Sequence, residues 1–174
     1  MTAENDNALI IFSRLPIGHE TKTRLAPILN ETQRAELHLA MWRDIFADGY
    51  KRAVIIGSDI PSVRAENISR AFDSLNDFDA VIGPSDDGGY WLIGMGKYIP
   101  EAFNVSSWGN SSVLDETVKT LSEQGISYCT AETLDDIDTP EDINAFMSVE
   151  RNKRTHTYEY ITKSLPHKAR GRYF

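Results

Sequence analysis

Acidic side chains follow apolar runs of this chain in positions that are typical of a divalent-cation site. Asp59 comes two residues after the end of the apolar run 53–57, and Asp136 and Asp138 lie two positions apart in an acidic segment. Side chains two positions apart point the same way in an extended chain. Carboxylate oxygens are the ligands that Mg²⁺ takes most readily. The pattern therefore predicts one divalent ion held by Asp59, Asp136 and Asp138.

A second acidic loop contains paired glycines between two apolar runs. Asp86 and Asp87 precede Gly88 and Gly89 there. Glycine permits backbone conformations and close approaches that other residues forbid, which suits the wall of an active site. The alternative is an ordinary hairpin turn, for which Asp-Gly is the usual sequence.

Three cations lie just after the first apolar run, which covers residues 8–13. Arg14, Lys22 and Arg24 share a loop with Gly18. A buried strand that delivers a cationic loop to the carboxyl edge of a sheet is a common way to hold a phosphorylated ligand. A site in which basic side chains bind a polyphosphate and carboxylates hold a metal ion suits phosphoryl or nucleotidyl transfer.

Simpler explanations exist for some of these residues. Asp59 is also well placed to cap a helix. The alternative for the basic loop is a surface loop that binds no ligand. Residues 136–139 are similar to the nucleophile motif of haloacid-dehalogenase-type phosphatases, with Asp136 as nucleophile. That motif belongs early in a chain and after a strongly apolar strand, whereas here it is late and follows a weakly apolar segment.

Strands and helices that position these residues are expected to alternate along the chain. We expect helices near 31–48, 62–75 and 112–124, and a fourth that begins at Thr139 with Pro140 in its first turn and Asp142 three residues on. Expected strands are 8–13, 53–57, 79–83, 90–95 and 126–130. Such alternation predicts a three-layer α/β/α fold around a mostly parallel sheet.

Composition is that of a single globular domain. The chain has 174 residues, of which 41% are hydrophobic and 25% are charged. Net charge is −8, and the body at 1–150 is acidic, whereas residues 151–174 hold seven basic residues and one acid. We expect a ligand-binding domain at 1–150 and a basic helix or tail at 151–174. An acidic body makes nucleic acid an unlikely partner.

Cysteine content and hydropathy indicate which cellular compartment to expect. Cys129 is the single cysteine, so a disulfide framework is excluded and a reducing cytoplasm is expected. Cys129 itself is expected to fill the core. No apolar run approaches the roughly 18 residues that span a bilayer, so no membrane association is expected.

Five blocks in a fixed order resemble a known bacterial family. The family has a glycosyltransferase-A-like fold and is often described as associated with radical-SAM and selenium-related genes. It is similar to phospholactate guanylyltransferases and molybdenum-cofactor nucleotidyltransferases. The blocks are Phe12-Ser13-Arg14-x-Pro16-x-Gly18 with Lys22-Thr23-Arg24-Leu25, Gly57-Ser58-Asp59, Gly83-Pro84-Ser85-x-Asp87-Gly88-Gly89-Tyr90, Trp108-Gly109, and Asp136-Ile137-Asp138-Thr139-Pro140-Glu141-Asp142.

This resemblance implies a nucleotide-diphospho-sugar transferase fold, a Mg²⁺ or Mn²⁺ cofactor and specific roles for the matched residues. It implies metal ligation by Asp59 and Asp138 and catalytic roles for Asp59, Lys22 and Asp87. It implies acceptor contacts from Gly88, Gly89, Tyr90 and Trp108. The nucleotide would contact Arg14, Gly18, Lys22, Thr23, Arg24, Leu25 and Ser58.

One departure from the family concerns the chain between the first strand and the strand that leads to Asp59. Relatives carry another strand and helix there, on the order of 30 residues, which this chain lacks. We expect the missing strand to leave one edge of the sheet open, which favours a homodimer.

Two functional hypotheses follow. The first is a metal-dependent transferase that acts on a nucleoside triphosphate or nucleotide-sugar and transfers a nucleotidyl or glycosyl group to a small acceptor. The alternative is a non-catalytic member of the same fold that binds a nucleotide or a partner protein, which the missing unit favours.

Overall fold

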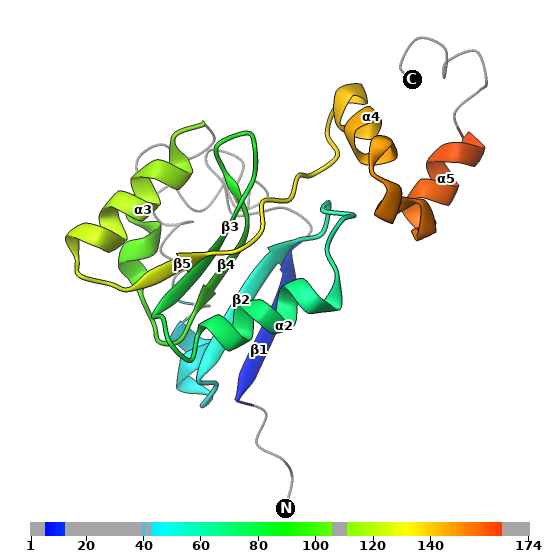
Figure 1. The fold of residues 1–174 in the computed structure, drawn as a ribbon. Coiled ribbons are helices and arrows are strands. Elements are labelled where there is room, and N and C mark those ends of the chain that lie inside the picture. Colours follow the sequence, from blue (N-terminus) through cyan, green and yellow to red (C-terminus); the bar gives the residue numbers. More distant parts are fainter. Residues whose placement is uncertain (1–5, 13–39, 41–42, 106–110, 165–174) are drawn as a thin grey trace, which may run out of the picture.

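A five-stranded sheet forms the centre of the protein, as shown by a computed structural model that describes residues 6–12, 40, 43–105 and 111–164. Helices cover both faces of the sheet, and a helical extension projects from one end (Figure 1). The elements are β1 (Asn7–Phe12), β2 (Arg52–Gly57), α2 (Ala65–Ser74), β3 (Ala80–Pro84), β4 (Tyr90–Met95), η3 (Pro100–Phe103), α3 (Val113–Glu123), β5 (Tyr128–Thr130), α4 (Pro140–Ser148), η4 (Glu150–Arg154) and α5 (His156–Ser164).

Strand order is β1-β2-β4-β3-β5, and the sheet is mixed: four of its five strands share one direction, as a mostly parallel sheet requires, but two of its four pairings are antiparallel. β1 pairs with β2 and β3 with β5 in parallel, whereas β4 runs antiparallel to both β2 and β3. β1, β2, β3 and β5 therefore share one direction. Their carboxyl ends meet at one edge of the sheet, where ligands bind in open α/β folds.

Apolar side chains alternate between two cores, one on each face of the sheet. Ile55, Ile82 and Ile93 face a cluster closed by η3 and α3. Val54, Val81 and Leu92 face a second cluster closed by α2. The period-two alternation of each strand thus produces the expected three layers.

Element positions agree closely with those expected from the sequence. The five expected strands are present, each within two residues at either end, and α2 is four residues and α3 two residues shorter than expected. Gly125 follows α3 with a positive φ of +67°, which is typical of a helix C-terminus. Most of the helix expected at 31–48 lies outside the described residues, although residues 43–47 are helical.

The missing strand-helix unit concerns the connection between β1 and β2. Of that connection the structure describes residue 40 and residues 43–51, and none of these lies in a strand. The remainder of the connection lies outside the described residues.

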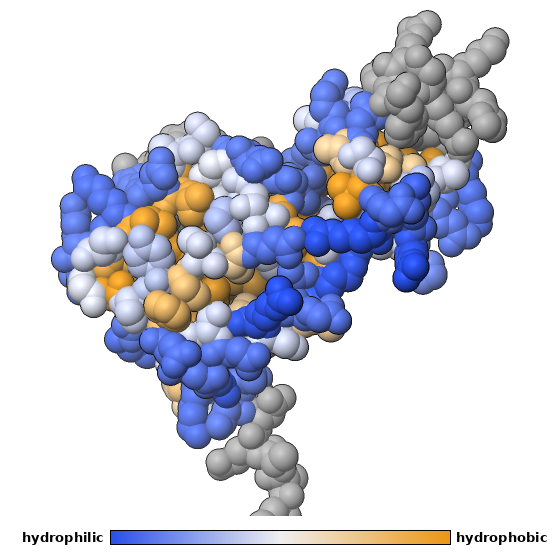
Figure 2. All heavy atoms as spheres, viewed as in Figure 1, coloured by the Kyte–Doolittle hydropathy of each residue, from blue (hydrophilic) through white to orange (hydrophobic). Residues whose placement is uncertain are grey.

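Three short helices, α4, η4 and α5, form a C-terminal arm at residues 140–164. The extended segment 131–138 connects this arm to the body (Figure 1). The expected domain boundary, between residues 150 and 151, falls inside this arm, at the start of η4. Hydrophilic residues cover the junction between the arm and the body in the view of Figure 2. No helix within the described ranges is long and apolar enough to cross a membrane.

β1 presents apolar side chains to solvent at the end of the sheet. Leu9 is 45% exposed and Ile11 is 63% exposed, and no described residue pairs with the second edge of β1. An uncovered edge with apolar side chains is a template for pairing with another chain. Antiparallel pairing of β1 with itself would place these side chains of two copies on one continuous face.

Dimerisation through β1 is therefore a testable prediction. We expect sedimentation velocity to show a concentration-dependent dimer for the native chain and a monomer for Ile11→Lys, because a charge on each copy opposes close pairing. The control is Tyr160→Lys, since Tyr160 is an equally exposed side chain on α5, remote from the sheet edge. A native chain that remains monomeric at every concentration contradicts the prediction.

Candidate metal centre

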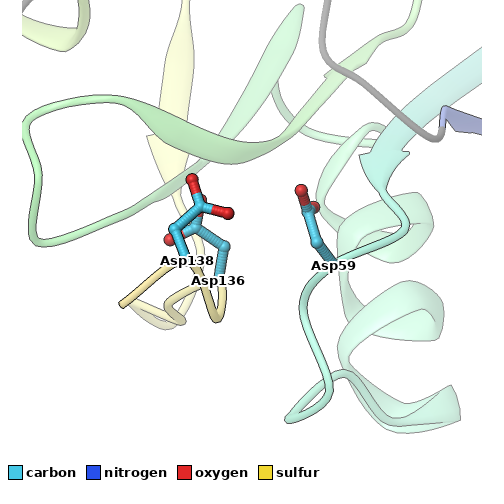
Figure 3. A group of neighbouring side chains, drawn as sticks. All are labelled: Asp59, Asp136 and Asp138. Atoms are coloured by element: carbon cyan, nitrogen blue, oxygen red, sulfur yellow. The ribbon is translucent and has the colours of Figure 1, made fainter. Parts of the chain in front are cut away.

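Three carboxylates from two separate segments converge at the carboxyl edge of the sheet. One oxygen atom from each of Asp59, Asp136 and Asp138 lies within 4.8 Å of the other two. Figure 3 shows the side chains of Asp136 and Asp138 together on one loop, with Asp59 facing them from another. Asp59 and Asp138 are exposed and Asp136 is half-buried. The structure thus brings together the three residues from which the sequence predicted a cation site.

Asp59 is held in place by the end of β2. The strand ends at Gly57, and a Cβ atom built on that glycine would lie 2.8 Å from the Asp59 Oδ1 atom. The Asp59 carboxylate therefore occupies space that only a glycine leaves free. Ile60, the next residue, is buried in the core on the α2 side and anchors the loop.

Asp136 and Asp138 are held by a ladder of backbone hydrogen bonds that continues beyond β5. Ala131 N–H donates to the Ile82 carbonyl (2.8 Å), and Leu134 N–H donates to the Pro84 carbonyl (3.1 Å). Ile137 N–H then donates to the carbonyl oxygen of Asp59 itself (3.3 Å). This last bond joins the two segments that carry the cluster.

The helix start after the cluster accounts for one further acid of the segment, Asp142. Thr139 Oγ1 accepts a hydrogen bond from Asp142 N–H (3.2 Å), and the Asp142 carboxylate accepts from Thr139 N–H (2.7 Å) and Asp138 N–H (3.0 Å). This reciprocal capping confirms the helix start at Thr139 that the sequence predicted. These hydrogen bonds, above all from Thr139, hold the pKa of Asp142 below its ordinary value. Asp142 therefore caps α4, whereas Asp136 and Asp138 remain available to a ligand.

The charge of the cluster is uncompensated by any described cation. None of its three carboxylates forms an ion pair with a Lys or Arg of the described residues. Burial, together with the neighbouring charges of Asp138, Asp87 and Asp59, raises the pKa of Asp136 to about 6. A divalent cation would remove this repulsion, so the donor set fits Mg²⁺ or Mn²⁺, both of which favour carboxylate oxygens.

The raised pKa of Asp136 has a consequence for stability without metal. The folded protein holds the Asp136 proton to about pH 6, whereas an ordinary Asp releases it near 3.8. Stability is therefore lost as the pH rises from about 4 to about 6. We predict that Asp136→Asn removes this loss in chelator-treated protein. At pH 8 the variant will melt about 2–4 °C above the native chain, equivalent to about 1 kcal/mol after solvent screening.

The comparison of melting temperatures at pH 4 and pH 8 checks this prediction. At pH 4 the two proteins will melt at nearly the same temperature, because Asp136 is then protonated. An equal difference at both pH values contradicts the electrostatic origin of the effect.

The loop with Asp87 forms a second wall beside the cluster. Asp87 Oδ1 accepts a hydrogen bond from Gly89 N–H (2.8 Å), and its charge contributes to the raised pKa of Asp136. Gly88 has a φ of +86°, and a Cβ atom there would lie only 2.0 Å from the Ser111 carbonyl oxygen. The paired glycines thus let this loop pass close against the start of α3.

A cavity of about 300 Å³ lies between this loop and the arm, next to the cluster. Its lining joins Asp87 and Asp136 from the body to residues of the arm. The arm contributes Asp142, Ala145, Phe146, Val149, Arg151 and Asn152. The body thus contributes carboxylates to the cavity, and the arm contributes apolar groups together with a carboxylate, a guanidinium and an amide.

Several expected site residues have a definite place in the structure. Ser58 lies next to Asp59, and Gly88 and Gly89 lie in the loop beside the cavity. Tyr90 differs from expectation, because its side chain is 4% exposed and packs in the core on the α3 side. A buried side chain offers no surface to an acceptor. The expected contacts from Arg14, Gly18, Lys22, Thr23, Arg24, Leu25 and Trp108 lie outside the described residues.

The arm residues that line the cavity were not foreseen from the sequence. Asn152 and Phe146 lie in a segment that reads as an ordinary amphipathic helix followed by a basic tail. No local motif marks them, because their place beside the cluster depends on long-range contacts between the arm and the body.

The fold defines the class of protein. Residues 6–164, with the gaps given above, form a mixed α/β domain of the nucleotide-diphospho-sugar transferase type. The crystal structure of a proposed nucleotide-diphospho-sugar transferase from Desulfovibrio desulfuricans G20 superposes with a TM-score of 0.70 and 27% sequence identity. The match covers 89% of this chain and 72% of that chain.

Sequence comparison then gives the family. Residues 24–110, half of the chain, match the model of a family described as "Uncharacterized protein conserved in bacteria (DUF2064)", and the chain belongs to this family. A search of curated proteins found no significant match.

Proposed function

We propose that this protein is a metal-dependent transferase that acts on a nucleotide-sugar or a nucleoside triphosphate. The observation that carries the proposal is the convergence of Asp59, Asp136 and Asp138 at the carboxyl edge of the sheet. A negative cluster without a described cation has a direct explanation in a bound metal ion. The likeness to a proposed nucleotide-diphospho-sugar transferase supports the choice of substrate.

Asp59 and Asp138 would hold the ion, with Asp136 as a third ligand. A bound Mg²⁺ or Mn²⁺ would supply charge neutralisation to the phosphates of the nucleotide. Arg14, Lys22 and Arg24 would bind those phosphates from the loop after β1, with Lys22 stabilising the charge that develops on the leaving group. The remaining nucleotide contacts are proposed for Gly18, Thr23, Leu25 and Ser58.

The acceptor would occupy the cavity beside the cluster. Asp87 lines this cavity and is near enough to Asp136 to raise its pKa, so it is the proposed general base for an acceptor hydroxyl. Gly88 and Gly89 would let the acceptor approach the backbone closely. Trp108 is a further proposed acceptor contact.

Glycosyl transfer from a nucleotide-sugar is the first reaction to test, because the described function of the structural neighbour names that donor class. Nucleotidyl transfer is the second, since the resemblance to phospholactate guanylyltransferases implies it. Both reactions need a metal ion and cations on a di- or triphosphate, and fold alone does not separate them.

A panel of nucleotides, screened by thermal melting with Mg²⁺, Mn²⁺ or chelator, tests the proposal. We expect at least one nucleoside diphosphate, triphosphate or nucleotide-sugar to raise the melting temperature only when metal is present. The same ligand will have no effect on Asp59→Ala. No shift across the whole panel with either metal contradicts the proposal.

Turnover assays with the selected nucleotide then separate an enzyme from the alternative. Metal-dependent hydrolysis or transfer that is lost in Asp87→Ala supports catalysis. Tight binding with no turnover toward any acceptor favours a non-catalytic nucleotide-binding member of the fold.

A further inference from the structure

The C-terminal arm carries none of the three clustered carboxylates, yet it contacts both segments that do. Three features of the junction connect the arm to the site: a buried amide on η4, an arginine in the Asp59 loop and a glutamate in the segment that leads to Asp136. The amide is hydrogen-bonded to the arginine, and the arginine is connected to the glutamate through Asn67, which accepts from Arg64 N–H (2.8 Å) and donates to Glu132 (3.1 Å).

Asn152 on η4 is the centre of the junction. It is 1% exposed, and both polar atoms of its amide group are hydrogen-bonded: Nδ2 donates to the Phe146 carbonyl (2.9 Å), and Oδ1 accepts from Arg64 Nη2 (3.3 Å). A buried amide that loses a partner costs free energy, so this pair fixes where the arm docks.

Arg64 carries the connection to the Asp59 loop. Its Nη1 atom donates to two backbone carbonyls, those of Pro61 (3.0 Å) and Val63 (2.9 Å). The turn that Arg64 closes in this way begins at Pro61, two residues after Asp59 and directly after the buried Ile60. One guanidinium therefore binds both the metal-site loop and the arm.

Glu132 carries the connection to the other half of the cluster. Its carboxylate accepts from Asn67 Nδ2 on α2 (3.1 Å) and from Arg151 Nη1 on η4 (3.0 Å), and its carbonyl accepts from the buried Trp91 Nε1 (3.0 Å). The same extended segment continues four residues later to Asp136. The arm thus contacts both sides of the carboxylate cluster.

From these contacts we infer that Arg64 and Asn152 are positioning residues for the metal site, and that docking of the arm holds Asp59 against Asp136 and Asp138. The inference rests on the proposed function, because it requires that the cluster bind a metal. By linkage, metal binding in turn stabilises the docked arm.

Mn²⁺ affinity, measured by calorimetry on the full chain, tests the inference. Asn152→Ala removes the acceptor for Arg64 and leaves every carboxylate in place, so we expect binding about tenfold weaker than in the native chain. Arg64→Ala will weaken binding at least as much. The double variant will be no weaker than Arg64→Ala alone, because both residues act through one contact.

Lys153→Ala is the matched control. Lys153 lies beside Asn152 on η4, but its ion pair with Glu150 stays within the arm. This variant will bind Mn²⁺ as the native chain does. Arg64→Lys keeps the charge but cannot reach all three acceptors, and we expect about threefold weaker binding. It provides the measurement if Asn152→Ala does not fold.

Two results overturn the inference, and they are distinguishable. If the native chain binds Mn²⁺ and Asn152→Ala and Arg64→Lys bind it within twofold of the native affinity, the positioning role is wrong and the metal site stands. If the native chain binds no Mn²⁺, the proposed metal site and the positioning role both fall.

Discussion

Addition of Mn²⁺ will raise the melting temperature of the native chain by about 5–10 °C and leave that of Asp59→Ala and Asp138→Ala unchanged. An ion present at 100 times its dissociation constant stabilises the folded state by about 2.7 kcal/mol. In a chain of this length each kcal/mol moves the melting temperature by about 2–4 °C. Each variant removes one carboxylate from a three-carboxylate cluster, which leaves too few ligands for tight binding.

The same variants will behave in the opposite sense when metal is withheld. Burial is the main cause of the raised pKa of Asp136, and the charges of Asp138 and Asp59 add to it. Removal of either carboxylate relieves its share of this repulsion, so both variants will melt at or above the native temperature in chelator. Asp73→Ala is the control, since Asp73 is an exposed acid on α2, remote from the cluster. A Mn²⁺ shift in Asp59→Ala equal to that of the native chain contradicts the assignment of the site.

Gly88→Ala will cause the largest loss of stability among small substitutions near the site. An alanine at φ +86° costs about 1–2 kcal/mol in backbone strain. Its Cβ would also lie 2.0 Å from a backbone carbonyl oxygen, that of Ser111, which cannot rotate away as a flexible side chain can. With a further cost of about 1–3 kcal/mol for overpacking, we expect the melting temperature to fall by about 6–12 °C.

Gly125→Ala separates these two contributions. Gly125 has a similar positive φ of +67°, but no atom lies within 4 Å of a Cβ built there. Its replacement will therefore show the backbone strain alone, about 1–2 kcal/mol. Equal losses for the two variants would contradict the close contact between the Gly88 loop and the start of α3.

The strands and the order of the acidic loops could be predicted because both follow from local patterns. Alternating or continuous apolar runs mark β2, β3 and β4, and turn residues mark their ends. Once the strands are known to be parallel, Asp59 and Asp138 must lie at the same edge. The proximity of these two residues, about 80 positions apart, thus followed from the two acidic loops and from the rule that parallel strands end at one edge of the sheet.

Contacts made by the arm could not be predicted in this way. Asn152 belongs to a stretch whose composition indicates an exposed basic tail, yet it is among the most buried polar residues described. Its side chain accepts a hydrogen bond from Arg64, 88 positions earlier in the chain, and such a long-range contact leaves no periodic signal in the sequence. Tyr90 was expected to contact the acceptor, because it is an aromatic residue beside a glycine loop, but its side chain packs in the core.

The raised pKa of Asp136 could not be predicted from the sequence either. Sequence spacing placed Asp136 beside Asp138, but only the fold brings Asp87 and Asp59 near it as well. Four acids gather around one point because three strand ends share one edge of the sheet. The chemistry of the site is therefore a property of the topology rather than of any one motif.

Titration of the native chain with Mn²⁺, followed by electron paramagnetic resonance, tests the central claim most directly. The account predicts one Mn²⁺ per chain, bound more tightly when the nucleotide selected by the melting panel is present, and no such site in Asp59→Ala or Asp138→Ala. Free Mn²⁺ signal that is unchanged by the native protein, with and without nucleotide, would contradict the claim that this cluster is a metal-nucleotide site.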